Sequence, residues 1–147
     1  MTVSRHHVAA LQAALAGDAG SFDRLDHGLD LSEGREFPTL LSTAFIIAAR
    51  LRFAGDWSTA DVIRFVSQAR IRDGNRTTVS PTLAEQLILS ALRDTPLSVP
   101  ADEIATAYTQ FILMKSLVTD LDDERLSLLL AQAQDSANQW IAEQASA

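Results

Sequence analysis

The most distinctive chemical feature of this sequence is a group of arginines between residues 50 and 76, because guanidinium groups bind phosphates and carboxylates through paired hydrogen bonds. Arg64, Gln68 and Arg72 recur every four residues, so they would form one polar stripe on a helix. Arg50 precedes the stripe and Arg76 follows it. The pattern predicts an anion or partner contact through Arg50, Arg64, Arg72 and Arg76. The alternative, which we favour, is a solvated face balanced by acidic residues elsewhere in the chain.

The distribution of charge limits what these arginines can bind. The chain carries a net charge of −7. Residues 50–76 hold six arginines against three acids, whereas residues 94–147 hold nine acids against Lys115 and Arg125. An acidic protein repels nucleic acids and anionic membranes as a whole, although a local basic surface can override that repulsion. Nucleic-acid or anion binding through the arginine stripe is therefore the weakest of the functional hypotheses.

Metal-binding chemistry is not indicated by the histidines or by the acidic clusters. His6 and His7 are adjacent, so on a helix their side chains point ~100° apart, and His27 is distant in sequence. The acidic run at residues 120–124 lacks the sixth-position glycine and twelfth-position glutamate of a calcium-binding loop. It precedes a predicted helix, where carboxylates accept hydrogen bonds from the first amides. We expect neither a metal nor a cofactor.

Catalytic motifs are also missing from the sequence. The six glycines form no phosphate-binding loop, no nucleophile elbow surrounds a serine, and there are no cysteines. Lys115, the only lysine, lies among apolar residues, a setting in which an amine can act as a nucleophile. Such a side chain more often lays its methylenes along the core and brings its ammonium to water. The sequence therefore favours a protein that is not an enzyme and identifies no catalytic residue, although a site assembled from scattered residues stays open.

Two apolar residues near the C-terminus are candidates for a partner interface. One helical stripe in this region comprises Leu126, Leu129, Leu130, Ala133, Ala137, Trp140 and Ile141. Trp140 lies at the end of this stripe, so packing in the core is its first interpretation and a partner contact is the alternative. Leu128 falls off the stripe. Exposed apolar groups on a long amphipathic helix often mark a binding surface, which makes Leu128 and Trp140 the predicted interface residues.

Helical periodicity dominates the chain and determines which elements position these residues. Apolar spacing and capping signals predict helices over about 4–16, 21–27, 38–53, 58–72, 81–94, 100–118 and 122–141. The clearest start is at Ser58, which is followed three residues later by Asp61 as in a capping box. No segment alternates as a half-buried strand does. We predict an all-α fold, a single-domain orthogonal or antiparallel bundle of about six to seven helices over residues 1–147, frayed at about 142–147.

Length and composition agree with this fold class. A chain of 147 residues fits one domain with its own core, and its 47% hydrophobic content is typical of a globular protein. Eleven arginines against one lysine suggest a GC-rich bacterial genome. The first residues contain no apolar segment of signal-peptide type, and no apolar run approaches the ~20 residues of a membrane span. We therefore expect an acidic cytoplasmic protein that does not contact membranes.

Three functional hypotheses follow from the sequence. The first is a non-enzymatic helical protein-interaction or regulatory module of unknown specific role, which binds a protein partner or self-associates as a homodimer through the last helix. The second is a small-molecule-binding protein or minor enzyme with a pocket between the helices predicted over 38–53, 58–72 and 100–118. The third is nucleic-acid or anion binding through the arginine stripe.

Overall fold

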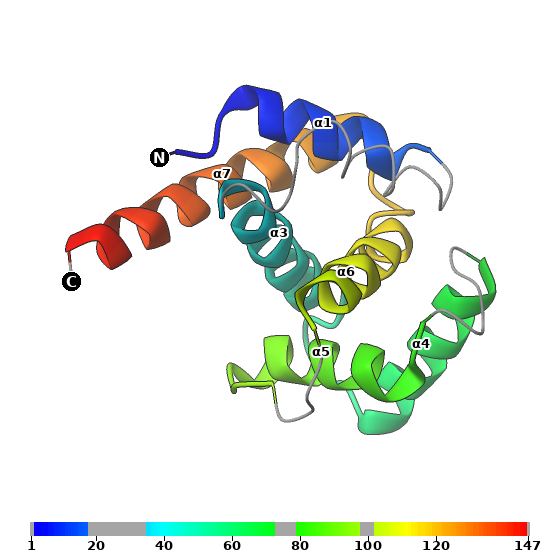
Figure 1. The fold of residues 1–147 in the computed structure, drawn as a ribbon. Helices are drawn as coiled ribbons and strands as arrows, with labels where there is room; N and C mark the ends of the chain where they lie inside the picture. The colour runs from blue at the N-terminus through cyan, green and yellow to red at the C-terminus, as the bar shows by residue number, and fades with distance from the viewer. Residues whose placement is uncertain (1, 18–34, 73–78, 98–101, 147) are drawn as a thin grey trace. The chain divides into compact units, whose positions relative to one another are not determined.

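The chain folds into helices throughout the part that the structure describes. The computed structural model describes residues 2–17, 35–72, 79–97 and 102–146 (Figure 1). Within these ranges there is no strand, and the helices are α1 (Arg5–Leu15), α3 (Glu36–Arg52), α4 (Thr59–Arg72), α5 (Pro81–Arg93), α6 (Glu103–Leu117) and α7 (Asp123–Ser146). The predicted all-α fold is thereby confirmed. The short helix predicted over 21–27, together with Arg76, lies outside the described residues.

Backbone contacts divide the chain into two compact units. The first comprises residues 1–44 and 120–147, so that it contains α1, the beginning of α3 and α7. The second comprises residues 45–119, with the end of α3 and the whole of α4, α5 and α6. The boundary falls inside α3, between Ala44 and Phe45. The expectation of a single domain over residues 1–147 is not tested by this division and stays a prediction.

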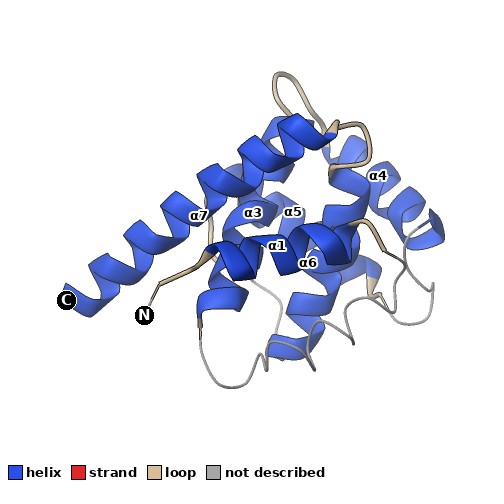
Figure 2. Cartoon of the chain, turned by 90° about the horizontal axis from the view of Figure 1, so that it is seen from above, coloured by secondary structure: helices blue, strands red, loops and turns tan. Residues whose placement is uncertain are grey.

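In the first unit, α1 and α7 lie side by side and run antiparallel (Figure 2). Their direction follows from two polar contacts, because the amide of Asn138 bonds to the backbone of Val3 whereas Gln12 Nε2 lies 3.4 Å from Ser127 Oγ. Apolar side chains of both helices are buried, including Leu11 of α1 and Leu130 of α7, which have no exposed surface.

In the second unit, α4, α5 and α6 each pack against the other two. Helix α6 is buried almost all round over residues 109–114, where the apolar residues 111–114 follow the polar Thr109 and Gln110. Helix α4 is amphipathic and buries one stripe, Val62, Phe65, Val66 and Ala69. The buried residues of α4 recur at the three- and four-residue spacing of one helix face, and the position of this stripe determines which side chains α4 turns outward.

The helix starts agree closely with the capping signals in the sequence. Ser80 Oγ accepts a hydrogen bond from the Leu83 amide at 3.3 Å, with Pro81 in the first turn of α5. Asp122 Oδ1 accepts from the Arg125 amide at 2.8 Å at the start of α7. Two helix starts differ from prediction by more than one residue: α3 begins at Glu36, two residues before Pro38, and α6 begins at Glu103 rather than at Pro100. Asp102, the N-cap of α6, accepts from the Ala105 amide and sets that start.

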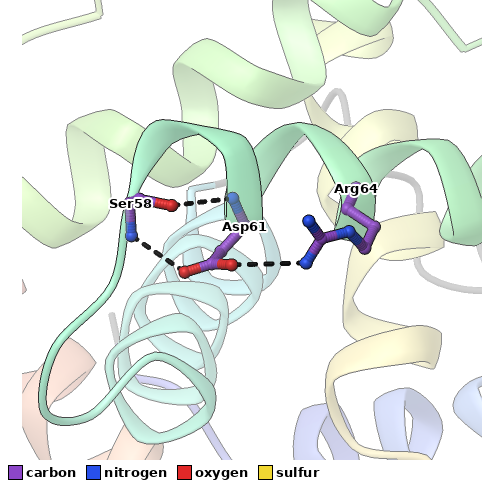
Figure 3. A network of polar contacts seen from close by, with 3 residues as sticks. All are labelled: Ser58, Asp61 and Arg64. Atoms are coloured by element: carbon purple, nitrogen blue, oxygen red, sulfur yellow. Dashed lines mark hydrogen bonds and ion pairs between the residues drawn. The ribbon is translucent and has the colours of Figure 1, made fainter.

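The capping box that opens α4 is complete. Ser58 Oγ accepts from the Asp61 amide at 3.2 Å, and Asp61 Oδ2 accepts from the Ser58 amide at 3.0 Å (Figure 3). Two backbone donors without a helical partner are thereby satisfied. The box therefore sets the first turn of α4 and the direction in which its outward side chains point.

Two further properties of the helices bear on the expectations above. None of the described helices combines the length and the apolar character needed to cross a lipid bilayer. Helix α7 continues to Ser146, five residues past the predicted end at Ile141. Fraying of the tail at about 142–147 concerns motion, so this bound does not test it.

Candidate functional site

Arg50 connects two helices of the second unit. Its Nε donates to the backbone oxygen of Ala91, 3.0 Å away, and its terminal nitrogen lies 3.7 Å from Asp94 Oδ1. Asp94 is the C-cap of α5 and takes a left-handed conformation with φ 53°. The Ala91 carbonyl belongs to the last turn of α5, where backbone oxygens lack helical partners. Arg50 therefore stabilises the end of α5, although it was predicted as a contact for a ligand or partner.

Two other arginines have comparable structural roles that the sequence did not reveal. Arg70 Nε donates to the backbone oxygen of Val79 at 2.8 Å, across the segment that precedes α5. The guanidinium carbon of Arg52 lies 5.5 Å and 5.6 Å from the ring centroids of Phe53 and Phe65. These two rings pack edge to face, with centroids 5.5 Å apart. The position of Arg52 and Arg70 near helix ends in the sequence indicates contacts with backbone carbonyls. It does not indicate which helix or ring each arginine contacts.

The remaining arginines of α4 lie on an exposed surface. Arg64 Nη1 lies 3.4 Å from Asp61 Oδ1 in an ion pair whose side chains are 68% and 45% exposed (Figure 3). Arg72 is exposed in the last turn of α4 and forms no ion pair with another described residue. Arg76 lies outside the described residues. Of the four predicted contacts, Arg64 and Arg72 therefore share one helix, and Arg50 is engaged elsewhere.

Exposed isoleucines accompany these arginines on α4. Ile63 is 47% exposed and Ile71 is 58% exposed. At 3.6 residues per turn the two isoleucines lie ~80° apart around the helix axis, and Ser67 lies between them. The stripe of Arg64, Gln68 and Arg72 lies next to them around the axis. We call this surface the outer face of α4, and it comprises Ile63, Arg64, Ser67, Gln68, Ile71 and Arg72, all of them exposed. Sequence reasoning identified the polar stripe of this face but missed its apolar half.

The outer face is locally basic in an acidic chain. Helix α4 carries three arginines and one aspartate, whereas the whole chain carries −7. The backbone amide of Ser58, and then its hydroxyl, lower the pKa of Asp61 below the usual 3.8, and the Arg64 guanidinium acts in the same direction. Asp61 is consequently ionised near neutral pH and offsets part of the charge of Arg64. Arg72 forms no ion pair with another described residue, so its charge is not offset in this way.

Leu128 and Trp140, the predicted interface residues of α7, are both exposed, at 66% and 44%. The first interpretation of Trp140, packing in the core, is therefore wrong, because this residue is 44% exposed to solvent. Twelve residues separate the two side chains, so they point ~120° apart around α7. The helix does not combine them into one surface, and each would contact a partner separately.

The polar groups of the interior give little support to a catalytic or metal site. Within the described ranges no group of three or more histidines, aspartates and glutamates could hold a metal ion. The buried polar residues of this part of the chain are Thr109 and Gln110, and every buried polar side-chain atom found there has a hydrogen-bond partner. The Lys115 ammonium lies 5.9 Å from the Phe111 ring centroid. His7 Nδ1 accepts from the Ser4 amide at 3.0 Å, which caps α1.

Comparison with known proteins finds no family model, no curated protein and no solved structure that matches this chain.

Proposed function

We propose that this chain is a non-enzymatic protein-interaction module whose contact surface is the outer face of α4. The observation that carries this proposal is the exposure of Ile63 and Ile71, two large apolar side chains on the same outward side of one helix. Burial of such side chains is the main favourable term in protein association. Arginine beside apolar residues is typical of interfaces, because its guanidinium group binds carboxylates and packs on apolar surface.

The alternative functions receive less support from the described residues. A pocket for a small molecule needs polar groups that converge on a cavity, yet Arg50 donates to a backbone carbonyl and the buried polar atoms are already paired. Nucleic-acid binding needs several cations directed at phosphates, whereas Arg50, Arg52 and Arg70 contact the protein itself. The outer face sets two isoleucines beside its two arginines, which suits a protein partner better than a phosphate backbone.

Trp140 supports a second contact, between two copies of the chain. Val3 pairs with Asn138, so the last turns of α7, residues 139–146, extend ~12 Å beyond this pairing. Trp140 is 44% exposed in these turns. A large aromatic side chain on a helix end is well placed to pack against its symmetry-related copy. This contact is independent of the outer face of α4, because Trp140 belongs to the first unit and α4 to the second.

The proposal is tested by photo-crosslinking in cells that express the chain. A photo-reactive amino acid in place of Ser67, at the middle of the outer face, should yield a discrete protein adduct, and the same group in place of exposed Gln132 on α7 serves as the control. The adduct should disappear in Ile63→Ser/Ile71→Ser, because the apolar contacts are lost. Equal adducts at both positions, an adduct that persists in the double variant, or no adduct would contradict the proposal.

A further inference from the structure

We infer that the partner of the outer face of α4 is an acidic amphipathic α-helix, which lays an apolar stripe across Ile63 and Ile71 and places carboxylates beside Arg64 and Arg72. This inference rests on the proposed function and adds the chemistry of the partner. It depends on the geometry of α4, on the spacing of its apolar side chains and on its charge.

The backbone of α4 favours a helical partner over an extended one. A peptide that binds as a strand needs an unpaired row of backbone N–H and C=O groups, as at the edge of a sheet. The outer face belongs to the middle and end of a regular helix, in which those groups bond to each other, and no strand is present among the described residues. A segment that contacts α4 through side chains gains no backbone hydrogen bonds from it, and a helix satisfies those groups internally.

The spacing of the apolar side chains matches a helical stripe. Ile63 and Ile71 are separated by ~12 Å along the axis, about two turns of helix. An amphipathic partner presents apolar residues at intervals of three, four and seven, which covers this length. Ser67 lies between the two isoleucines, and its small side chain leaves room for a large partner residue between them. The side chain of this partner residue would enter the space between neighbouring side chains of α4, as in ordinary helix packing.

Charge selects an acidic partner. Arg64 and Arg72 each directly follow one of the isoleucines, so they lie eight residues apart and on the same side of both. The ion pair between Arg64 and Asp61 is exposed, so it is weak and readily exchanged for a carboxylate of the partner. Arg72 forms no ion pair with another described residue. Exposed charges of this kind contribute more to specificity and association rate than to affinity, so the preference for acids should weaken with salt.

The experiment is a peptide-display selection on the full-length chain. The probe is a random library of peptides of about 16 residues, roughly four turns of helix. The baits are the wild-type chain, Ile63→Ser/Ile71→Ser and Arg64→Glu/Arg72→Glu. A matched control bait, Ile104→Ser/Arg125→Glu, changes an exposed isoleucine and an exposed arginine that lie outside α4. Circular dichroism and thermal melting of each bait confirm that it remains folded.

We expect the wild-type and control baits to enrich the same acidic peptides, with apolar residues three or four and seven positions apart. Their enrichment should fall about tenfold or more on Ile63→Ser/Ile71→Ser. The charge-reversed bait should prefer basic peptides with the same apolar spacing. If the peptides enriched on the wild-type bait are neutral or basic, or lack helical spacing, the inference is overturned. The proposed function still stands in that case, provided that binding of these peptides requires the isoleucines. Selection that is indifferent to the isoleucines, or absent, overturns both.

Discussion

The arginines of α3 and α4 differ in whether their guanidinium groups contact the protein itself. Arg50 bonds to the carbonyl of Ala91, and Arg70 bonds to that of Val79, so both side chains replace water at backbone oxygens. Arg64 and Arg72 instead lie on an exposed surface, where Arg64 pairs with Asp61 and Arg72 forms no ion pair with another described residue. Both pairs consist of arginines and carry the same charge. Only their contacts distinguish the structural pair, Arg50 and Arg70, from the pair with a candidate binding role, Arg64 and Arg72.

This distinction predicts opposite effects of two substitutions. Arg50→Ala should lower the free energy of unfolding by about 1 kcal/mol, because it leaves the Ala91 carbonyl without its charged donor and the site is half exposed. Arg72→Ala should change stability by less than about 0.5 kcal/mol, as expected for an exposed residue that forms no ion pair with another described residue. Urea denaturation of both variants gives the measurement. Equal losses in stability would mean that Arg72 is structural too.

The capping box of α4 makes a pH-dependent contribution. The pKa of Asp61 lies below its usual 3.8 in the folded chain, chiefly because its carboxylate accepts from the Ser58 amide. The stabilisation is therefore complete above the unfolded-state value and is lost as the pH falls through the lower folded value. We expect Asp61→Asn to be less stable than wild type near neutral pH and the difference to shrink below about pH 4. Denaturation at several pH values checks this.

A companion substitution removes the other half of the box. Ser58→Ala should cost about 1 kcal/mol, because the Asp61 amide loses its acceptor. Thr59→Ala, at the next position, is the control and should cost less. A pH-independent difference for Asp61→Asn, or a negligible effect of Ser58→Ala, would show that the box does not stabilise α4.

At the scale of elements, sequence spacing predicts most of what is local. The Ser58–Asp61 box, the buried stripe of α4 and the start of α5 depend on residues within two or three turns of each other, so periodicity and capping rules were sufficient. Contacts over long separations were not accessible. Arg50 meets a carbonyl 41 positions away, and a single sequence contains nothing that pairs them.

The same limit applies to exposure on the outer face of α4. Isoleucines at positions 63 and 71 look like ordinary apolar residues in the sequence, and only packing reveals that α5 and α6 cover the opposite side of the helix. The polar half of the candidate site was therefore predictable from a four-residue repeat. Its apolar half was not, since periodicity cannot distinguish a buried isoleucine from an exposed one at the edge of a stripe.

Asn138 contributes two polar contacts to the pairing of the N-terminal segment with α7. Asn138 Oδ1 accepts from the Val3 amide at 2.6 Å and its Nδ2 donates to the Val3 carbonyl at 3.1 Å, so one side chain satisfies both backbone groups of a residue that is 2% exposed. Asn138→Leu should destabilise this pairing by about 1 kcal/mol, because the buried Val3 amide loses its acceptor while the Val3 carbonyl keeps the hydrogen bond from Gln134 Nε2 at 3.0 Å. Hydrogen exchange of the Val3 amide should accelerate. Gln139→Leu, one exposed position further, is the matched control.

At the scale of the whole molecule, charge is divided unequally between the two units. Residues 1–44 and 120–147 contain twelve acids and four arginines, a net −8, whereas residues 45–119 contain seven acids and eight bases, a net +1. A contact through Trp140 brings two strongly acidic units together, but a contact through α4 joins a basic surface to an acidic partner. Salt screens both interactions, so it should strengthen the first contact and weaken the second.

Self-association through α7 can therefore be recognised by its response to salt as well as to mutation. We expect a dimer in sedimentation velocity whose dissociation constant falls as salt rises, because repulsion between the acidic units is screened. Trp140→Ala should return the chain to a monomer, since the substitution removes the largest apolar side chain exposed on α7. Leu128→Ala should leave the dimer intact, because the Leu128 side chain points to another side of the helix. A strict monomer at high concentration, or a dimer that survives Trp140→Ala, would mean that the exposure of Trp140 does not reflect contact between copies.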